Sequence, residues 1–288
     1  MFERGADGRP GSSIATRLLA VDGERSHPKF DRLATEEPLE IRLRAGDQTR
    51  TVAITMRTPG NDFELAAGFL YGEGVVAEPD DVRAISYCVD VPAEQQYNTV
   101  SVDLGREDLP ELDALERHFT TTSACGVCGK ASLEALHSRG LDRIESQARA
   151  TRSTIVGLPG RLRAAQGIFE KTGGLHAAAL FDLDGNPIAV REDVGRHNAM
   201  DKLIGWAFLN RKLPLEHRIV LVSGRSSYEL VQKCAAARIP IMCSVSAPSS
   251  LAVDLAREFG VTLVGFLRES RFNVYAHEER IELGTPTR

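Results

Sequence analysis

The sequence predicts a mixed α/β protein in which a small α+β domain precedes a larger α/β domain. Three observations support this prediction. The first third of the chain alternates apolar and polar residues at strand spacing around one helical pattern. The last part alternates strand-like and helix-like segments of regular length, which is typical of sheets with parallel strands. A polar segment without apolar periodicity, FTTTSACGVCGK at residues 119–130, separates the two patterns.

These patterns divide the chain into three expected parts. Residues 1–15 are rich in Gly, Ser and Arg without periodicity, and they are expected to form a disordered tail. Residues 16–118 are assigned to the small α+β domain. Residues 119–288 are assigned to the larger α/β domain, which begins with the CGVCG loop.

The small domain is expected to contain four strands and one helix. Its first two strands form a hairpin, because Gly46 and Asp47 supply turn residues between two alternating segments. A helix is expected to follow, because Phe63, Ala66 and Leu70 recur at helical spacing after a capping sequence at residues 58–62. The expected strands cover residues 39–43, 51–56, 82–89 and 98–104.

The large domain is expected to place two helices before a regular sheet. Asp184-Gly185-Asn186 predicts a hairpin at the start of that sheet. The strands that follow alternate with helices and are expected to be largely parallel. The expected helices cover residues 132–138, 158–171, 198–209, 227–237 and 249–259. The expected strands cover residues 176–182, 187–191, 218–223, 240–244, 261–266 and 272–275.

The composition excludes several functional classes. The 288 residues include 35 Lys and Arg against 40 Asp and Glu, so the formal net charge is −5. Non-specific nucleic-acid binding requires a basic excess, and no nucleic-acid partner is therefore expected. Apolar runs such as residues 177–181 are far shorter than the ~20 residues that span a bilayer. Residues 1–13 carry charge and glycine in place of the apolar core of a signal peptide, so a reducing cytoplasm is expected.

Cys125 and Cys128 in the CGVCG loop are the sharpest chemical feature. A thiol is nucleophilic as the thiolate, and a nearby cation such as Lys130 favours that form. Flanking glycines keep both thiols accessible. The pair fits disulfide exchange, zinc binding, or carriage of a sulfur atom as a persulfide.

Each alternative makes a different demand on the rest of the chain. A thioredoxin-like pair should follow a buried strand, whereas the polar residues 120–123 precede this one. A zinc site needs two further ligands, and the remaining candidates are Cys234 and Cys243, on an expected helix and the next strand. Two cysteines without a role in a surface loop are disfavoured, because exposed thiols are a liability.

Small hydroxyl, glycine and arginine residues follow three of the expected strands. In open α/β sheets, ligands bind in the crevice beyond the carboxyl ends of the strands. Arg225, Arg268 and Arg271, together with helix N-termini, suit phosphate oxygens there. An anionic, nucleotide-bearing ligand is therefore indicated, although helix capping and solvated arginines would also explain each stretch. The stretches are residues 223–227, 244–250 and 265–271.

The turn at residues 192–198, EDVGRHN, is a further candidate. It places two acids, an arginine and a histidine between a strand and a helix, where sites are easily built. Alternatively, Asp193 is the helix N-cap and His197 a structural residue of the first turn. Residues 173–176, GGLH, are similarly ambiguous, because the glycines suffice to end a helix.

Taken together, these motifs resemble the FdhD family of sulfur-carrier accessory proteins for formate dehydrogenase. The resemblance extends from about residue 35 to 280, and the motifs occur in the family's order. They are TTSACGVCGK (121–130), GGLHAA (173–178), EDVGRHNAMDKLIG (192–205), SGRSSYELVQK (223–233), SVSAPSSLAVDLA (244–256) and GFLRESR (265–271).

The resemblance implies a cytoplasmic sulfurtransferase and homodimer. The protein would take sulfur from an IscS-type cysteine desulfurase and pass it to the molybdenum cofactor before that cofactor is inserted into formate dehydrogenase. The cargo would be Mo-bis(molybdopterin guanine dinucleotide), which GDP-like nucleotides can mimic. Cys125 would carry the persulfide, and Cys128 would assist either by accepting the sulfur in a relay or by resolving the persulfide as a disulfide. The expected cofactor-binding residues are Phe266, Leu267, Arg268, Glu269, Ser270 and Arg271, with Arg225 and His197.

The family's C-terminal half is described as cytidine-deaminase-like, which agrees with the expected order of elements. The zinc-binding signature of true deaminases has no counterpart here, so neither deamination nor a metal site is expected. Two other functions remain open. A thiol–disulfide oxidoreductase would reduce disulfides without a sulfur donor. A zinc-stabilised scaffold would unfold on chelation.

Overall fold

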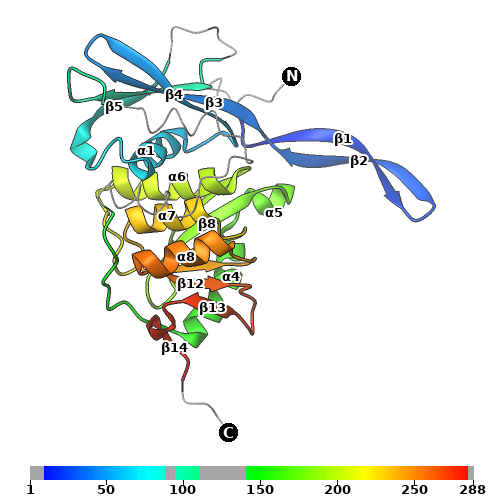
Figure 1. The fold of residues 1–288 in the computed structure, drawn as a ribbon. Helices are drawn as coiled ribbons and strands as arrows, with labels where there is room; N and C mark the ends of the chain where they lie inside the picture. The colour runs from blue at the N-terminus through cyan, green and yellow to red at the C-terminus, as the bar shows by residue number, and fades with distance from the viewer. Residues whose placement is uncertain (1–9, 89–91, 93–94, 111–140, 285–288) are drawn as a thin grey trace.

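The computed structural model describes residues 10–88, 92, 95–110 and 141–284. Two main sheets lie one above the other in Figure 1, and the helices α1 (Asp62–Gly72) and α6 (Arg196–Leu209) pack together between them. A two-stranded ribbon extends sideways from the upper part of the molecule. Within the described residues, no helix is long and apolar enough to cross a membrane.

The ribbon consists of β1 (Ser13–Asp22) and β2 (Arg25–Ala34), which pair only with each other within the described part of the chain. The disordered tail expected at residues 1–15 is wrong for its last residues, because β1 begins at Ser13. Residues 1–9 lie outside the described residues. Its turn places Gly23 at a φ of 60°, in the left-handed region that glycine adopts readily. Gly23, the first residue of the two-residue turn 23–24, is the sequence signal that indicates this hairpin.

The upper sheet has the strand order β4-β3-β6-β5, and α1 covers one face. Its strands are β3 (Glu37–Ala45), β4 (Gln48–Arg57), β5 (Val82–Tyr87) and β6 (Thr99–Leu104), and a short 3₁₀ helix, η1 (Pro79–Asp81), precedes β5. The predicted hairpin and strands of this part are confirmed, because β3 and β4 pair antiparallel through the turn at residues 46–47.

The cap of α1 differs from the prediction. Asn61 occupies the N-cap position with a φ of 57°, and its side chain makes no capping hydrogen bond. Instead, the carboxylate of Asp62, the first helical residue, accepts hydrogen bonds of 3.1 Å from both Nε and Nη2 of the buried Arg57. The start of α1 is thus fixed by an ion pair to β4.

The lower sheet has the order β13-β12-β11-β10-β8-β9. The central strands β10, β11 and β12 are parallel as predicted, whereas β8, β9 and β13 run antiparallel to their neighbours. The strands are β8 (His176–Phe181), β9 (Pro187–Asp193), β10 (Ile219–Val222), β11 (Ile241–Ser244), β12 (Thr262–Gly265) and β13 (Asn273–Ala276).

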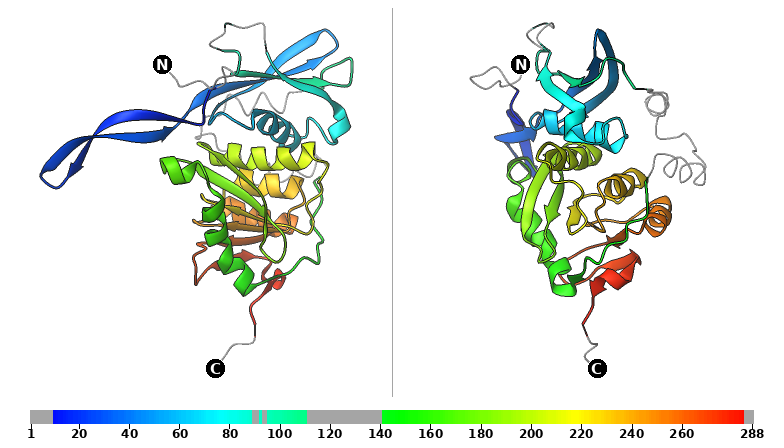
Figure 2. Two further views of the ribbon diagram at one scale, coloured as in Figure 1. Left: turned by 180° about the vertical axis from the view of Figure 1, so that it is seen from behind. Right: turned by 90° about the vertical axis from the view of Figure 1, so that its left-hand side faces the viewer.

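Two apolar cores sandwich this sheet. The helices α6, α7 (Tyr228–Ala236) and α8 (Ser250–Phe259) cover one face. The helix α4 (Arg152–Ala165) covers the other and is best seen from behind in Figure 2. Near α4, the short strands β7 (Ala150–Thr151) and β14 (Ile281–Glu282) pair in parallel, after the 3₁₀ helix η2 (Glu278–Arg280).

The helix expected at residues 158–171 is displaced. The observed α4 begins at Arg152, because Oγ1 of Thr151 accepts a hydrogen bond of 3.1 Å from the Thr154 backbone. It ends at Ala165, before Gly167, and a separate turn of helix, α5 (Phe169–Thr172), follows. The helix expected at residues 132–138 lies outside the described residues, as does the polar loop from residue 111 onward.

The helices α1 and α6 cross at a pair of glycines. A Cβ added to Gly68 would lie 1.9 Å from the backbone oxygen of Asp201, and one added to Gly205 would lie 1.8 Å from that of Glu64. The two backbones therefore touch directly. Arg191 reinforces the crossing, because its Nη2 lies 2.7 Å from Oε1 of Glu64 on α1.

Candidate functional site

The three stretches that follow β10, β11 and β12 lie together at one edge of the lower sheet. The backbone of Ser249 donates to the carbonyl of Ser226 at 3.0 Å, and that of Phe266 donates to Ser246 at 3.1 Å. His176, the last residue of the GGLH stretch, begins the antiparallel strand β8 and lies at the same edge. The Ser223 backbone N–H donates to the carbonyl of Ala177, the next residue, at 2.9 Å. The predicted gathering of these stretches at the carboxyl ends of parallel strands is confirmed.

A buried ion pair holds the turn between β9 and α6 at this edge. Nζ of Lys202 lies 2.6 Å from Oδ2 of Asp193 and donates to the backbone oxygen of Thr58 at 2.8 Å, and both charged side chains are almost completely buried. The N-cap of α6 is Gly195, so Asp193 is not the cap considered above. It instead accepts hydrogen bonds from the Gly195 backbone and the Asn198 side chain, which fixes the first turn of α6.

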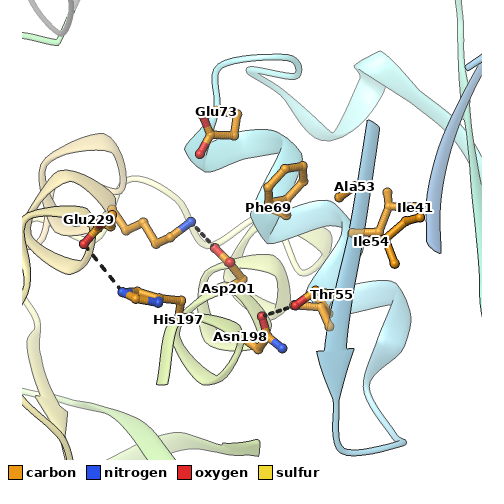
Figure 3. Close-up of a pocket in the computed structure, with 12 residues that line it drawn as sticks. Ile41, Ala53, Ile54, Thr55, Phe69, Glu73, His197, Asn198, Asp201 and Glu229 are labelled. Atoms are coloured by element: carbon orange, nitrogen blue, oxygen red, sulfur yellow. Dashed lines mark hydrogen bonds and ion pairs between the residues drawn. The ribbon is translucent and has the colours of Figure 1, made fainter. Parts of the chain in front are cut away.

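His197 joins the N-termini of α6 and α7. Its Nε2 lies 3.0 Å from Oγ of Ser227, the N-cap residue of α7, and 3.6 Å from Oε2 of Glu229 (Figure 3). The neighbouring imidazole of His197 lowers the pKa of Glu229 to about 2. Because Ser227 and Glu229 meet the same ring nitrogen, the three residues form a bridge between helices and lack the geometry of a catalytic triad.

A pocket of about 220 Å³ opens beside this bridge, between α1, α6, α7 and the upper sheet. One wall is apolar and includes Ile41, Leu65 and Phe69. The opposite wall carries the buried ion pair of Lys233 and Asp201, whose Nζ and Oδ1 lie 2.5 Å apart. His197 faces this pocket, and within the described residues its side chain makes no hydrogen bond or ion pair with the stretch after β12.

The expected cofactor segment at residues 266–271 is mostly exposed. Phe266 is 43% exposed and has a φ of 52°, a left-handed conformation that is unusual for a bulky residue and is found at functional sites. The guanidinium of Arg268 donates to the backbone oxygen of Val245. The backbone N–H of Arg268 donates to the backbone oxygen of Arg271 at 2.8 Å, which closes a tight turn. Leu267 is fully buried, so its side chain packs in the core and does not face a ligand.

The other expected ligand residues of this edge are free to bind. The side chains of Arg225, Glu269, Ser270 and Arg271 are exposed. Within the part of the chain that the structure describes, none of the four makes a side-chain hydrogen bond or ion pair. The loop after β11 separates Arg225 from the other three, because it pairs with Ser226 on one side through Pro248 and accepts a hydrogen bond from Phe266 on the other through Ser246.

Four of the five cysteines fall into two groups, and the fifth, Cys88, is partly buried beside the upper sheet. Cys125 and Cys128 lie outside the described residues. Cys234 and Cys243 are buried in the cores on opposite faces of the lower sheet, and burial raises the pKa of each thiol. These two thiols therefore behave as core residues, and they do not supply the adjacent ligands that the zinc alternative requires. No metal-binding cluster occurs among the described residues.

The structure brings to the same edge three residues that belong to the candidate stretches 192–198, 173–176 and 223–227 but were not among the expected ligand residues. Arg196 and His176 flank Gly224, because a Cβ at Gly224 would lie 3.4 Å from Cδ of Arg196 and from Nδ1 of His176. Ser226 follows in the same loop, and its hydroxyl is buried without a partner in the described structure. The signals are present in the Arg196-His197 pair at a helix start and in the histidine after Gly173-Gly174.

Comparison with known proteins gives consistent matches along the chain. Residues 34–282 match the FdhD/NarQ family. A sulfur carrier protein FdhD from Streptomyces coelicolor is 54% identical over 88% of this chain and 90% of its own length. A sulfur carrier protein FdhD from Mycolicibacterium paratuberculosis is 52% identical over 92% of this chain and 97% of its own length. The crystal structure of a candidate formate dehydrogenase accessory protein from Desulfotalea psychrophila, 27% identical, superposes with a TM-score of 0.72 and covers 94% of this chain and 99% of its own.

Proposed function

Because the chain belongs to the FdhD/NarQ family, we propose that it is a sulfur carrier that serves formate dehydrogenase. The observation that carries this proposal is the identity of about half of all residues, over nearly the full length of both chains, to proteins named for that role. The structural neighbour described as a formate dehydrogenase accessory protein supports the same role.

We propose that Cys125 carries the sulfur as a persulfide and that the donor is an IscS-type cysteine desulfurase. The Cys125 thiolate would attack the outer sulfur of the donor's persulfide, so that a new S–S bond forms and the donor cysteine leaves as its thiolate. Cys128 would then attack the inner sulfur of the Cys125 persulfide. This step forms the Cys125–Cys128 disulfide and releases the outer sulfur as hydrosulfide, so its two electrons come from the cysteine pair.

The acceptor in this proposal is the Mo-bis(molybdopterin guanine dinucleotide) cofactor, bound as cargo. The edge of the lower sheet suits its phosphate and guanine groups, because Arg225 and Arg271 are exposed without partners among the described residues and Phe266 offers an exposed aromatic ring. The protein would supply binding and orientation, whereas the metal chemistry would belong to the cofactor.

The remaining family properties are part of the same proposal. We propose a cytoplasmic sulfurtransferase that acts as a homodimer, with a large domain of the cytidine-deaminase-like class. The order of a helix, a hairpin and then alternating helices and strands supports that class. The deaminase chemistry itself is not proposed, since Arg196-His197 and Ser226-Ser227 stand at the helix starts where deaminases place zinc ligands.

The persulfide is tested by substitution of its carrier. We expect Cys125→Ser to abolish loading, because a hydroxyl cannot accept sulfane sulfur, and to leave nucleotide binding unchanged. Intact-mass analysis after incubation with a cysteine desulfurase and cysteine should show one reductant-labile sulfur atom on the wild type and none on the variant. Cys128→Ser is the matched control, since it should still load. A loaded Cys125→Ser variant would contradict the assignment, and rapid donor-independent reduction of a model disulfide would favour an oxidoreductase.

The cofactor segment is tested with GDP as a fragment of the cargo. We expect Arg271→Ala and Arg268→Ala each to weaken GDP binding about tenfold or more, because a charge-assisted hydrogen bond contributes about 1.5–3 kcal/mol. Isothermal titration calorimetry measures this loss. Arg83→Ala is the control, because Arg83 lies on the upper sheet, where it pairs with Asp103. Unchanged affinity in both test variants would place the nucleotide elsewhere.

A further inference from the structure

Three polar side chains from different elements, those of Arg196, His176 and Ser226, come to the carboxyl edge of the lower sheet. Arg196 is the first residue of the 14-residue helix α6, His176 begins β8, and Ser226 lies between β10 and α7. Gly224 separates Arg196 from His176, and a methyl group there would touch both side chains at 3.4 Å. Because Gly224 has no side chain, this residue does not fill the space between the arginine and the imidazole.

Two donors on these side chains have no acceptors of their own. Nε of Arg196 and Oγ of Ser226 are both buried without a hydrogen-bond partner, and Ser226 is only 1% exposed. Buried polar groups are normally satisfied, so two orphaned donors at one edge require an explanation. Within the described ranges, the Arg196 guanidinium also meets no carboxylate, whereas the nearby cations Lys202 and Lys233 are each paired with an aspartate.

The local charges favour an anion at this point. Burial lowers the pKa of His176, and the nearby side chains of Arg196 and His197 lower it further, against the opposing charge of Asp193. Of the acids here, Asp193 is bound by Lys202, and Glu229 is bound to His197. The first N–H groups of α6 add unpaired donors and the positive end of the helix dipole.

We propose that Arg196, with His176 and Ser226, binds a phosphoryl group of the nucleotide-bearing ligand. A guanidinium, an imidazole, a hydroxyl and helix N–H groups supply donors from several directions, which matches a tetrahedral anion with several acceptor oxygens better than a planar carboxylate. In identifying the ligand as a nucleotide, this inference rests on the proposed function. It adds a second anchoring point, on loops other than the one that carries Arg268 and Arg271.

The test uses the full-length protein with inorganic pyrophosphate, GDP and guanosine as probes in a phosphate-free buffer. Calorimetry should show pyrophosphate and GDP binding to the wild type and much weaker binding of guanosine. Arg196→Gln should raise the dissociation constants of pyrophosphate and GDP about tenfold or more. Arg83→Gln, on the distant upper sheet, should change neither.

Ser226→Ala separates ligand binding from a structural role. The hydroxyl has no partner to lose, so the melting temperature should not fall, while pyrophosphate binding should weaken several-fold. A wild type that does not bind pyrophosphate, or an Arg196→Gln variant that binds it equally well, would overturn the inference. GDP binding that is independent of Arg196 would also overturn it and leave the proposed nucleotide site intact. Pyrophosphate binding that depends on Arg196, without GDP binding, would support the phosphoryl site and contradict the nucleotide ligand.

Discussion

Gly205→Ala is expected to lower the free energy of unfolding by about 3 kcal/mol or more. Overpacking a tight interior typically costs about 1–3 kcal/mol, and here the added methyl group would meet main-chain atoms that have no rotamer to change. The nearest atom is the backbone oxygen of Glu64 at 1.8 Å, so α1 and α6 must move apart. The intrinsic gain of about 1 kcal/mol from replacing a helical glycine is too small to offset this. Gly205→Leu should not yield a folded protein.

The measurement is urea unfolding followed by circular dichroism and by the fluorescence of Trp206, the only tryptophan, which neighbours Gly205 on α6. Gly160→Ala is the matched control. Gly160 also lies inside a helix, but nothing lies within 4 Å of the added Cβ, so this variant should gain about 0.5–1 kcal/mol. A Gly205→Ala variant as stable as the control would show that the helices do not touch at this point.

Lys202→Met is expected to cost about 3–5 kcal/mol, because it leaves Asp193 charged, buried and without its cation. Asp193 is fully buried and Lys202 is 1% exposed, so water does not replace the lost partner. The loss should appear as a lower urea midpoint with an unchanged slope. The exposed pair of Arg83 and Asp103 supplies the control: Arg83→Met should cost less than about 1 kcal/mol.

The double variant Lys202→Met/Asp193→Asn identifies the origin of this loss. If the unpaired charge is responsible, removal of that charge should restore part of the stability. A double variant that is less stable than Lys202→Met would instead show that the contacts of Asp193 with Gly195 and Asn198 dominate.

Local sequence signals were sufficient for much of the fold. Turn residues at Gly46 and at Asp184-Gly185-Asn186 mark the hairpins β3–β4 and β8–β9, because such turns require residues that tolerate unusual backbone angles. The alternation of strands and helices after residue 218 was equally clear. The ribbon of β1 and β2 was missed, since β2 contains Pro28 and several charges and shows almost no buried face.

Features that depend on distant residues could not be predicted in this way. Gly205 looks like a weak point in a helix until Gly68, far away in the chain, is seen against it. Lys202 looks like a surface residue until Asp193 is found beside it. The same holds for the site: the strand-end loops were predictable from topology, whereas the orphaned donors of Arg196 and Ser226 are visible only once their surroundings are known.

The helix α6 belongs to both halves of the molecule. It begins with Arg196 at the edge where we propose that the phosphoryl group binds, and near its other end Phe208 is buried in the core of the upper sheet. At 1.5 Å per residue, its 14 residues form a stiff rod about 20 Å long. A displacement of the upper sheet would therefore also move the start of α6, where the residues proposed to bind the ligand lie.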